Sequence, residues 1–179
     1  MKMIFKLILP LFCLFIVGCA KEYSFEKQLN PFHLNYTVDG VQRKSVFFAA
    51  GDFTDPGNGE LYIYGVTDSV QNSHSYIFSF EIVNHSKITV GEYTDADPDV
   101  FSAAVYTDSS NVINYLAGQT ILQQAISDGM TINNHFTVNV TSFENHSARG
   151  TFSGDFYDNG DPHGKMVKIT DGDFYIKMK

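Results

Sequence analysis

From Phe32 to the end of the chain, apolar and polar residues alternate through one short segment after another. Successive side chains of a β-strand point to opposite faces, so this period of two predicts strands with one buried and one solvated face. Asp39-Gly40 follows the first such segment and is a strong signal for a tight hairpin. The alternation excludes a mainly helical fold. The first segment sets the pattern, with Phe32, Leu34, Tyr36 and Val38 on one face and His33, Asn35 and Thr37 on the other.

About ten segments of this kind, spaced by Gly, Asp and Asn turns, predict an all-β antiparallel β-sandwich of short strands. A lipocalin-like β-barrel is the alternative, because aromatic inward faces can also line a cavity. One segment departs from the period: apolar residues between Thr120 and Asp128 recur at helical spacing, and Gly129 fits the position after a helix end. We therefore expect one short helix. The predicted core consists of Phe78, Phe80, Phe136, Val138, Phe152, Phe156, Phe174 and Ile176.

The N-terminus differs from the rest of the chain. Lys2 and Lys6 precede an apolar run over residues 7–17, which is too short to span a bilayer, and Gly18 then precedes Cys19. The run resembles the processing site of bacterial lipoproteins, which are cut before such a cysteine and then acylated on it. The resemblance implies a signal peptide over residues 1–18, an acylated Cys19 with a polar tether over residues 19–31, and a single β-rich domain over residues 32–179.

Acylation implies a location for the protein. Fatty acyl chains such as palmitate on Cys19 would hold it stably to a lipid bilayer. The resemblance to bacterial lipoproteins implies an outer-membrane lipoprotein, exposed either at the cell surface or on the periplasmic face. Such a domain could bind a protein or a glycan.

Removal of residues 1–18 takes away Lys2 and Lys6, which leaves 10 basic residues against 20 acidic ones. A net charge of −10 repels polyanions, so we expect no nucleic-acid partner. The chain has 2 cysteines, Cys13 in the signal and Cys19 at the acylation site. Residues 32–179 therefore contain no disulfide, no thiolate zinc site and no cysteine nucleophile.

Several short stretches are similar to those of small β-rich lipoproteins from Bacteroidetes-type bacteria, a group with no established activity. They are Cys19-Ala20-Lys21-Glu22, Tyr36-Thr37-Val38-Asp39-Gly40, Gly150-Thr151-Phe152-Ser153-Gly154 and Ile169-Thr170-Asp171-Gly172-Asp173-Phe174-Tyr175-Ile176. The resemblance implies an envelope β-domain. It also suggests O-glycosylation at Ser69, because Asp68-Ser69-Val70 matches the acceptor pattern used in that group.

The candidate sites are few. Asp95, Asp97 and Asp99 alternate on one predicted turn and offer oxygen ligands for calcium, although the glycine and glutamate of an EF-hand are missing. The competing interpretation is a solvated turn, and we otherwise expect no cofactor. His135 and His146 could meet across a hairpin. Sugars or peptides could stack on an exposed tyrosine face, which would use Tyr62, Tyr64, Tyr76, Tyr93 and Tyr106.

Nucleotide-binding and serine-hydrolase motifs are missing from the sequence. These observations favour a cell-envelope lipoprotein that acts as a non-catalytic binding or structural module. The alternatives are a small hydrolase or enzyme accessory subunit, and a carrier of an apolar ligand.

Overall fold

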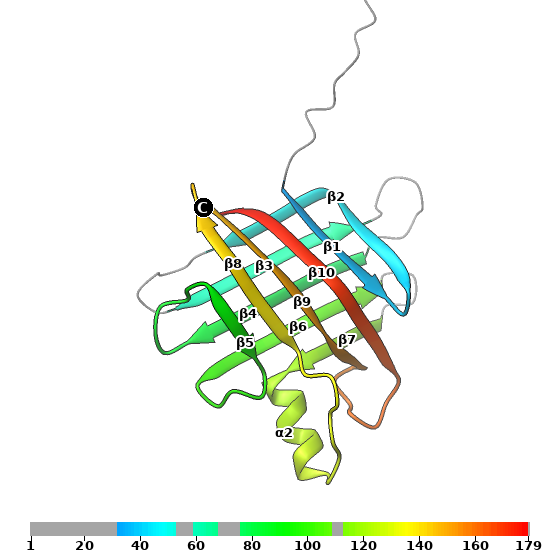
Figure 1. Ribbon diagram of the computed structural model, residues 1–179. Coiled ribbons are helices and arrows are strands. Elements are labelled where there is room, and N and C mark those ends of the chain that lie inside the picture. The colour runs from blue at the N-terminus through cyan, green and yellow to red at the C-terminus, as the bar shows by residue number, and fades with distance from the viewer. Residues whose placement is uncertain (1–31, 53–58, 68–75, 109–112, 179) are drawn as a thin grey trace, which may run out of the picture. The chain divides into compact units, whose positions relative to one another are not determined.

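Ten strands and one helix make up the part of the chain that the computed structural model describes (Figure 1). That part comprises residues 32–52, 59–67, 76–108 and 113–178, with the backbone alone for residues 45–52. Pro31–Lys179 forms one compact unit. The elements are β1 His33–Val38, β2 Val41–Asp52, β3 Glu60–Thr67, β4 Tyr76–Asn84, β5 Gly91–Thr94, β6 Val100–Asp108, β7 Ile113–Gly118, α2 Gln119–Ser127, β8 Thr137–Glu144, β9 Ser147–Asp158 and β10 Met166–Met178.

The strands pair into a ring. β1, β2, β3, β4, β6, β7, β9 and β10 are joined in that order by antiparallel pairs, and β10 pairs with β1 to close the circuit. The β7–β9 junction is narrow, with only Tyr115↔Asp158 and Leu116↔Tyr157 in register. β8 pairs with the other end of β9, and β5 extends that side of the sheet.

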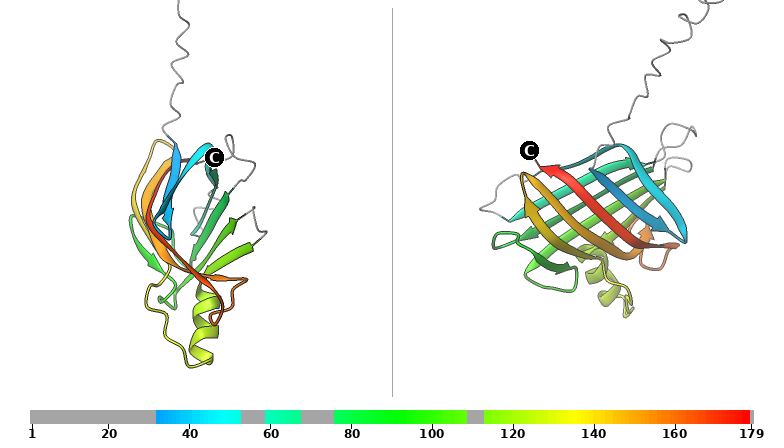
Figure 2. Two further views of the ribbon diagram at one scale, coloured as in Figure 1. Left: turned by 90° about the vertical axis from the view of Figure 1, so that its right-hand side faces the viewer. Right: turned by 45° about the horizontal axis from the view of Figure 1, so that its top comes forward.

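The ring is flattened into two layers (Figures 1 and 2). We call β5, β8, β9, β10 and β1 the front layer, and β2, β3, β4, β6 and β7 the back layer. The strands of the front layer cross those of the back layer steeply in Figure 1. The prediction of an all-β antiparallel fold is confirmed. The fold combines the packed layers of a sandwich with the edge-to-edge closure of a barrel.

The alternating apolar residues of β1 are buried, as predicted from the sequence. In β1 Leu34, Tyr36 and Val38 are buried, while the residues between them are only partly so. Asp39 and Gly40 form the hairpin turn with φ of 46° and 82°, and Val38 pairs with Val41 across it. Two left-handed residues in succession are the requirement of a type I′ turn, and an Asp-Gly pair meets it at little cost.

Aromatic rings from both layers fill the space between them. Phe78 of β4 stacks on Phe152 of β9 with ring centroids 4.8 Å apart, and this contact joins the back layer to the front layer. Phe80 packs against Phe174 of β10 at 5.7 Å and against Phe136 at 5.9 Å. All eight residues of the predicted core are buried in this cluster. In the described part of the chain the interior is thus a packed core.

The predicted helix is α2, which follows β7 directly. Its end has the arrangement of a Schellman motif: Gly129 has φ +72°, its N–H donates to the carbonyl of Ile126, and the N–H of Met130 donates to that of Ala125. Ile121 and Ala125 face a second, smaller apolar cluster with Ile132 and Tyr157.

Candidate functional site: a buried carboxylate pair and a polar depression

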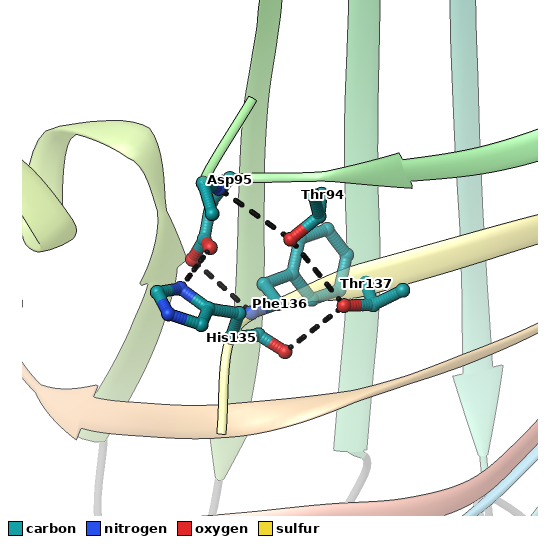
Figure 3. A network of polar contacts seen from close by, with 6 residues as sticks. Thr94, Asp95, His135, Phe136 and Thr137 are labelled. Carbon is teal, nitrogen blue, oxygen red and sulfur yellow. Dashed lines mark hydrogen bonds and ion pairs between the residues drawn. The ribbon is translucent and has the colours of Figure 1, made fainter. Parts of the chain in front are cut away.

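Two aspartates, Asp95 and Asp155, are buried on the front layer. Asp95 forms hydrogen bonds with two different residues (Figure 3). β5 and β8 end their pairing at Thr94↔Thr137, and Asp95 continues the ladder with its side chain. The N–H of Asp95 donates to the carbonyl of Phe136 at 3.0 Å, and the N–H of Phe136 donates back to Oδ2 of Asp95 at 3.1 Å. The other carboxylate oxygen, Oδ1, lies 2.8 Å from Nδ1 of His135.

The burial of Asp95 has an electrostatic consequence. Its relative exposure is 3%, and this desolvation raises the pKa of the carboxyl above its ordinary value. The hydrogen bonds from Phe136 and His135, together with the charge of His135, act in the opposite direction without cancelling the effect of burial. The imidazole itself is about one-third exposed.

Asp155 of β9 is the second buried carboxylate. Both of its oxygens accept from Nδ2 of Asn134, at 3.1 and 3.0 Å, and its N–H donates to the carbonyl of Asn134 at 3.1 Å. Tyr157 lies two residues further along β9 and is buried among Ile121, Ala125 and Ile132. Burial raises the pKa of Tyr157, and the negative charges of Asp155 and Asp95 raise it further. Two acidic groups therefore act on one phenol.

The Asp95–His135 pair has the geometry of a proton-transfer pair. A carboxylate on Nδ1 fixes the ring and its tautomer, and leaves Nε2 to exchange a proton with a neighbour. Within the described residues, no hydrogen bond joins Nε2 of His135 to a hydroxyl that could serve as a nucleophile. The pair also has a structural effect, because it fastens the α2–β8 connection to the end of β5.

The predicted calcium ligands are not brought together. Asp95 is engaged with His135 and Phe136, whereas Oδ1 of Asp97 accepts from the N–H of Asp99 at 3.0 Å within the turn. Asp99 is exposed. Across the described ranges no three His, Cys, Asp or Glu residues are grouped closely enough to hold a metal ion. The turn thus orders itself by its own hydrogen bonds.

The other candidate residues lie apart or outside the description. Cys19 and Ser69 fall outside the described residues, so acylation and glycosylation stay predictions. His135 precedes β8 and His146 follows it, so the two histidines lie at opposite ends of the strand. The tyrosines do not share one face: Tyr62 and Tyr64 stack at 5.9 Å on β3, whereas Tyr93 and Tyr106 are buried.

A partly buried arginine was not expected from the sequence. Arg43 is opposite Tyr36 in the β1–β2 register, and its guanidinium lies 4.2 Å from the ring centroid of Tyr76. Burial raises the pKa of Tyr106 to about 12, although a hydrogen bond from Arg43 acts against this rise. The group is a cation–π contact at one end of the ring of strands.

A shallow depression lies on the outward face of the front layer. Its volume is about 350 Å³. We call it the front-layer depression, and it is lined by Glu92, Thr137, Asn139, Thr151, Phe152, Ser153, Asp171 and Gly172. Sequence reasoning missed it because its residues come from four strands. The one available signal was the polar alternation of Thr137 with Asn139 and of Thr151 with Ser153.

Searches of protein-family models, curated proteins and solved structures each found no match for this chain. None of the helices in the described residues is both long and apolar enough to cross a membrane.

Proposed function

We propose that the protein is a lipid-anchored component of the bacterial outer membrane whose β domain acts as a non-catalytic binding module. The front-layer depression is the observation that carries the binding role. It presents carboxylate, amide and hydroxyl groups on strands whose inner faces pack in the aromatic core. A site on packed strands holds its side chains in fixed positions, which lowers the entropy cost of binding.

Support for the anchor comes from the sequence around Cys19. A short basic start, an apolar run and a small residue before the cysteine are the elements that lipoprotein processing requires. Two or three acyl chains give stable attachment, since each buried CH₂ contributes about 0.8 kcal/mol. The polar residues between Cys19 and Pro31 would then separate the lipid from the fold.

Metabolic labelling with an alkyne analogue of palmitate tests the anchor. We expect the wild-type protein to carry the label and to sediment with membranes, and Cys19→Ser to lose both properties. Cys13→Ser is the matched control, because it removes the other cysteine and should keep the label. Label that persists in Cys19→Ser would contradict the anchor. Protease added to intact cells then distinguishes surface exposure, which predicts degradation, from the periplasmic face, which predicts protection.

The Asp95–His135 pair supports a second candidate, a small hydrolase. An imidazole oriented through Nδ1 is half of the machinery for general-base catalysis. If the protein is a hydrolase, hydrolysis of p-nitrophenyl esters or glycosides should exceed the blank and fall at least about a hundredfold in His135→Gln. The binding module predicts no turnover above the blank for either protein.

A further inference from the structure

We propose that the front-layer depression binds a neutral, hydroxyl-rich glycan. This inference rests on the proposed role as a binding module and names the ligand class of that site.

The register places the polar side chains in two short rows across the strands. Glu92 of β5 pairs with Asn139 of β8, and Asn139 pairs with Thr151 of β9. In the second row Thr137 pairs with Ser153. Adjacent strands are about 4.8 Å apart and alternate residues about 7 Å apart along a strand, so the rows form a flat lattice of polar groups. A lattice of this kind suits a ligand that carries many hydroxyls at short intervals.

A bulge in β10 supplies two residues of the lining, Asp171 and Gly172. The β9–β10 register shifts between Ile169 and Gly172, and Asp171 within the bulge has φ 51°. Gly172 lies so close to Phe152 that a Cβ there would be 2.2 Å from the carbonyl oxygen and 2.6 Å from the ring. Gly172 therefore contributes only backbone to the depression, with the ring of Phe152 packed against it on the core side and the carboxylate of Asp171 beside it.

The lining groups are available to a ligand. Within the described residues, no hydrogen bond to another residue is made by the side chains of Glu92, Asn139, Thr151 or Ser153. Thr137 donates weakly to Thr94 and to the carbonyl of His135, and Asp171 accepts from its neighbour Thr170. Unpaired donors and acceptors on a rigid sheet can exchange water for ligand hydroxyls.

The chemistry of the lining selects the ligand class. A carboxylate accepts two hydrogen bonds at once, which matches neighbouring hydroxyls of a sugar, while the amide and hydroxyl groups both donate and accept. The lining contains two carboxylates and no Lys or Arg, so phosphate and other anions are repelled. The one aromatic residue of the lining, Phe152, has its ring buried against Phe78 in the core, so the depression offers no exposed ring to an apolar ligand. A neutral polyol can form hydrogen bonds with all of these groups, while Glu92 and Asp171, which are exposed, keep part of their contact with water.

Titration of the full-length protein with defined hexasaccharides tests the proposal. The probes are maltohexaose, cellohexaose, xylohexaose and mannohexaose, with chitosan hexamer as the cationic probe and hyaluronan hexamer as the anionic one. Calorimetry should detect at least one neutral probe. The double variant Glu92→Ala/Asn139→Ala should weaken that binding about tenfold or more, because it removes a charged and a neutral hydrogen-bonding group. Glu144→Ala, at an exposed carboxylate of β8 outside the depression, is the control and should bind as wild type.

A second variant, Thr151→Arg, fills the depression sterically and should abolish binding while the β-type circular dichroism is retained. The proposal is overturned if no neutral probe binds at millimolar concentration, if the double variant and Thr151→Arg bind as well as wild type, or if only the chitosan hexamer binds. Palmitate labelling that depends on Cys19 would still support the anchor in each of these cases, so failure of the glycan site is distinguishable from failure of the proposed function.

Discussion

Among single residues, Asp95 is unusual because its carboxylate acts as the acceptor that a backbone carbonyl would otherwise provide. Its carboxylate accepts the N–H of Phe136, which lies beyond the last paired residues of β5 and β8, and its second oxygen meets His135. A buried carboxylate is unfavourable unless its oxygens are hydrogen-bonded, and here both have partners. The residue predicted as a cation ligand thus connects two segments of the chain, the end of β5 and the α2–β8 connection.

The burial of Asp95 predicts a pH dependence of stability. Because its pKa is higher in the folded protein than in the unfolded chain, the folded state binds the proton more tightly. The contribution of this group to the free energy of unfolding is present below the ordinary Asp pKa of about 3.9 and is lost as the pH rises through the raised pKa. Urea unfolding between pH 3.5 and 5.5, where imidazoles ordinarily stay protonated, measures this loss.

We expect the stability difference between wild type and Asp95→Asn to shrink as the pH rises over that range. Asp99→Asn removes an exposed carboxylate from the same turn and should keep the wild-type profile. Parallel curves for wild type and Asp95→Asn would contradict the assignment of the slope to this carboxyl.

Among the strands, β9 contributes alternate residues to the core and to the front-layer depression. In Gly150-Thr151-Phe152-Ser153-Gly154 the glycines and the phenylalanine face inward, and Thr151 and Ser153 face the depression. A Cβ on Gly150 would be 2.5 Å from the ring of Phe174, and one on Gly154 would be 2.9 Å from the backbone of Phe136. The glycines make room for aromatic side chains of neighbouring segments.

Two glycine substitutions distinguish steric overpacking of the core from backbone strain. Gly150→Ala should destabilise the domain by about 1–3 kcal/mol, because the added methyl overpacks the core between the two layers. Gly129→Ala meets open space and should cost about 1 kcal/mol, through the left-handed φ of +72° alone. Thermal melts of both variants measure the difference. A smaller loss for Gly150→Ala than for Gly129→Ala would contradict this view of the core.

Local patterns predict elements better than they predict sites. Strand alternation, the Asp39-Gly40 hairpin and the helix before Gly129 could all be predicted from neighbouring residues, and so could the eight residues of the predicted core. The Asp155–Asn134 contact could not, because alternation places Asp155 on the solvent side of β9 and only the α2–β8 connection covers it. Ring closure also depends on pairings between distant segments, which have no local signal.

At the scale of the whole molecule, packing must supply the stability. Residues 32–179 contain no cysteine, and the described part of the chain has no cluster suited to a metal. We therefore expect a chain that begins at Lys21 to melt cooperatively in excess EDTA, at the same temperature as in its absence. If calcium binds, it should raise the melting temperature by mass action without creating the fold. Loss of β-type circular dichroism on chelation would contradict this expectation.

The first strand of the fold, β1, pairs with the last one, β10. His33 at the start of β1 pairs with Tyr175 near the end of β10, so the ring cannot close until nearly the whole chain is available. Contacts of such long sequence separation make folding slow. If the protein is exported as we propose, this delay has a consequence. Until β10 is available the ring of strands cannot close, so the chain stays unfolded during translocation and becomes rigid only after β10 has crossed.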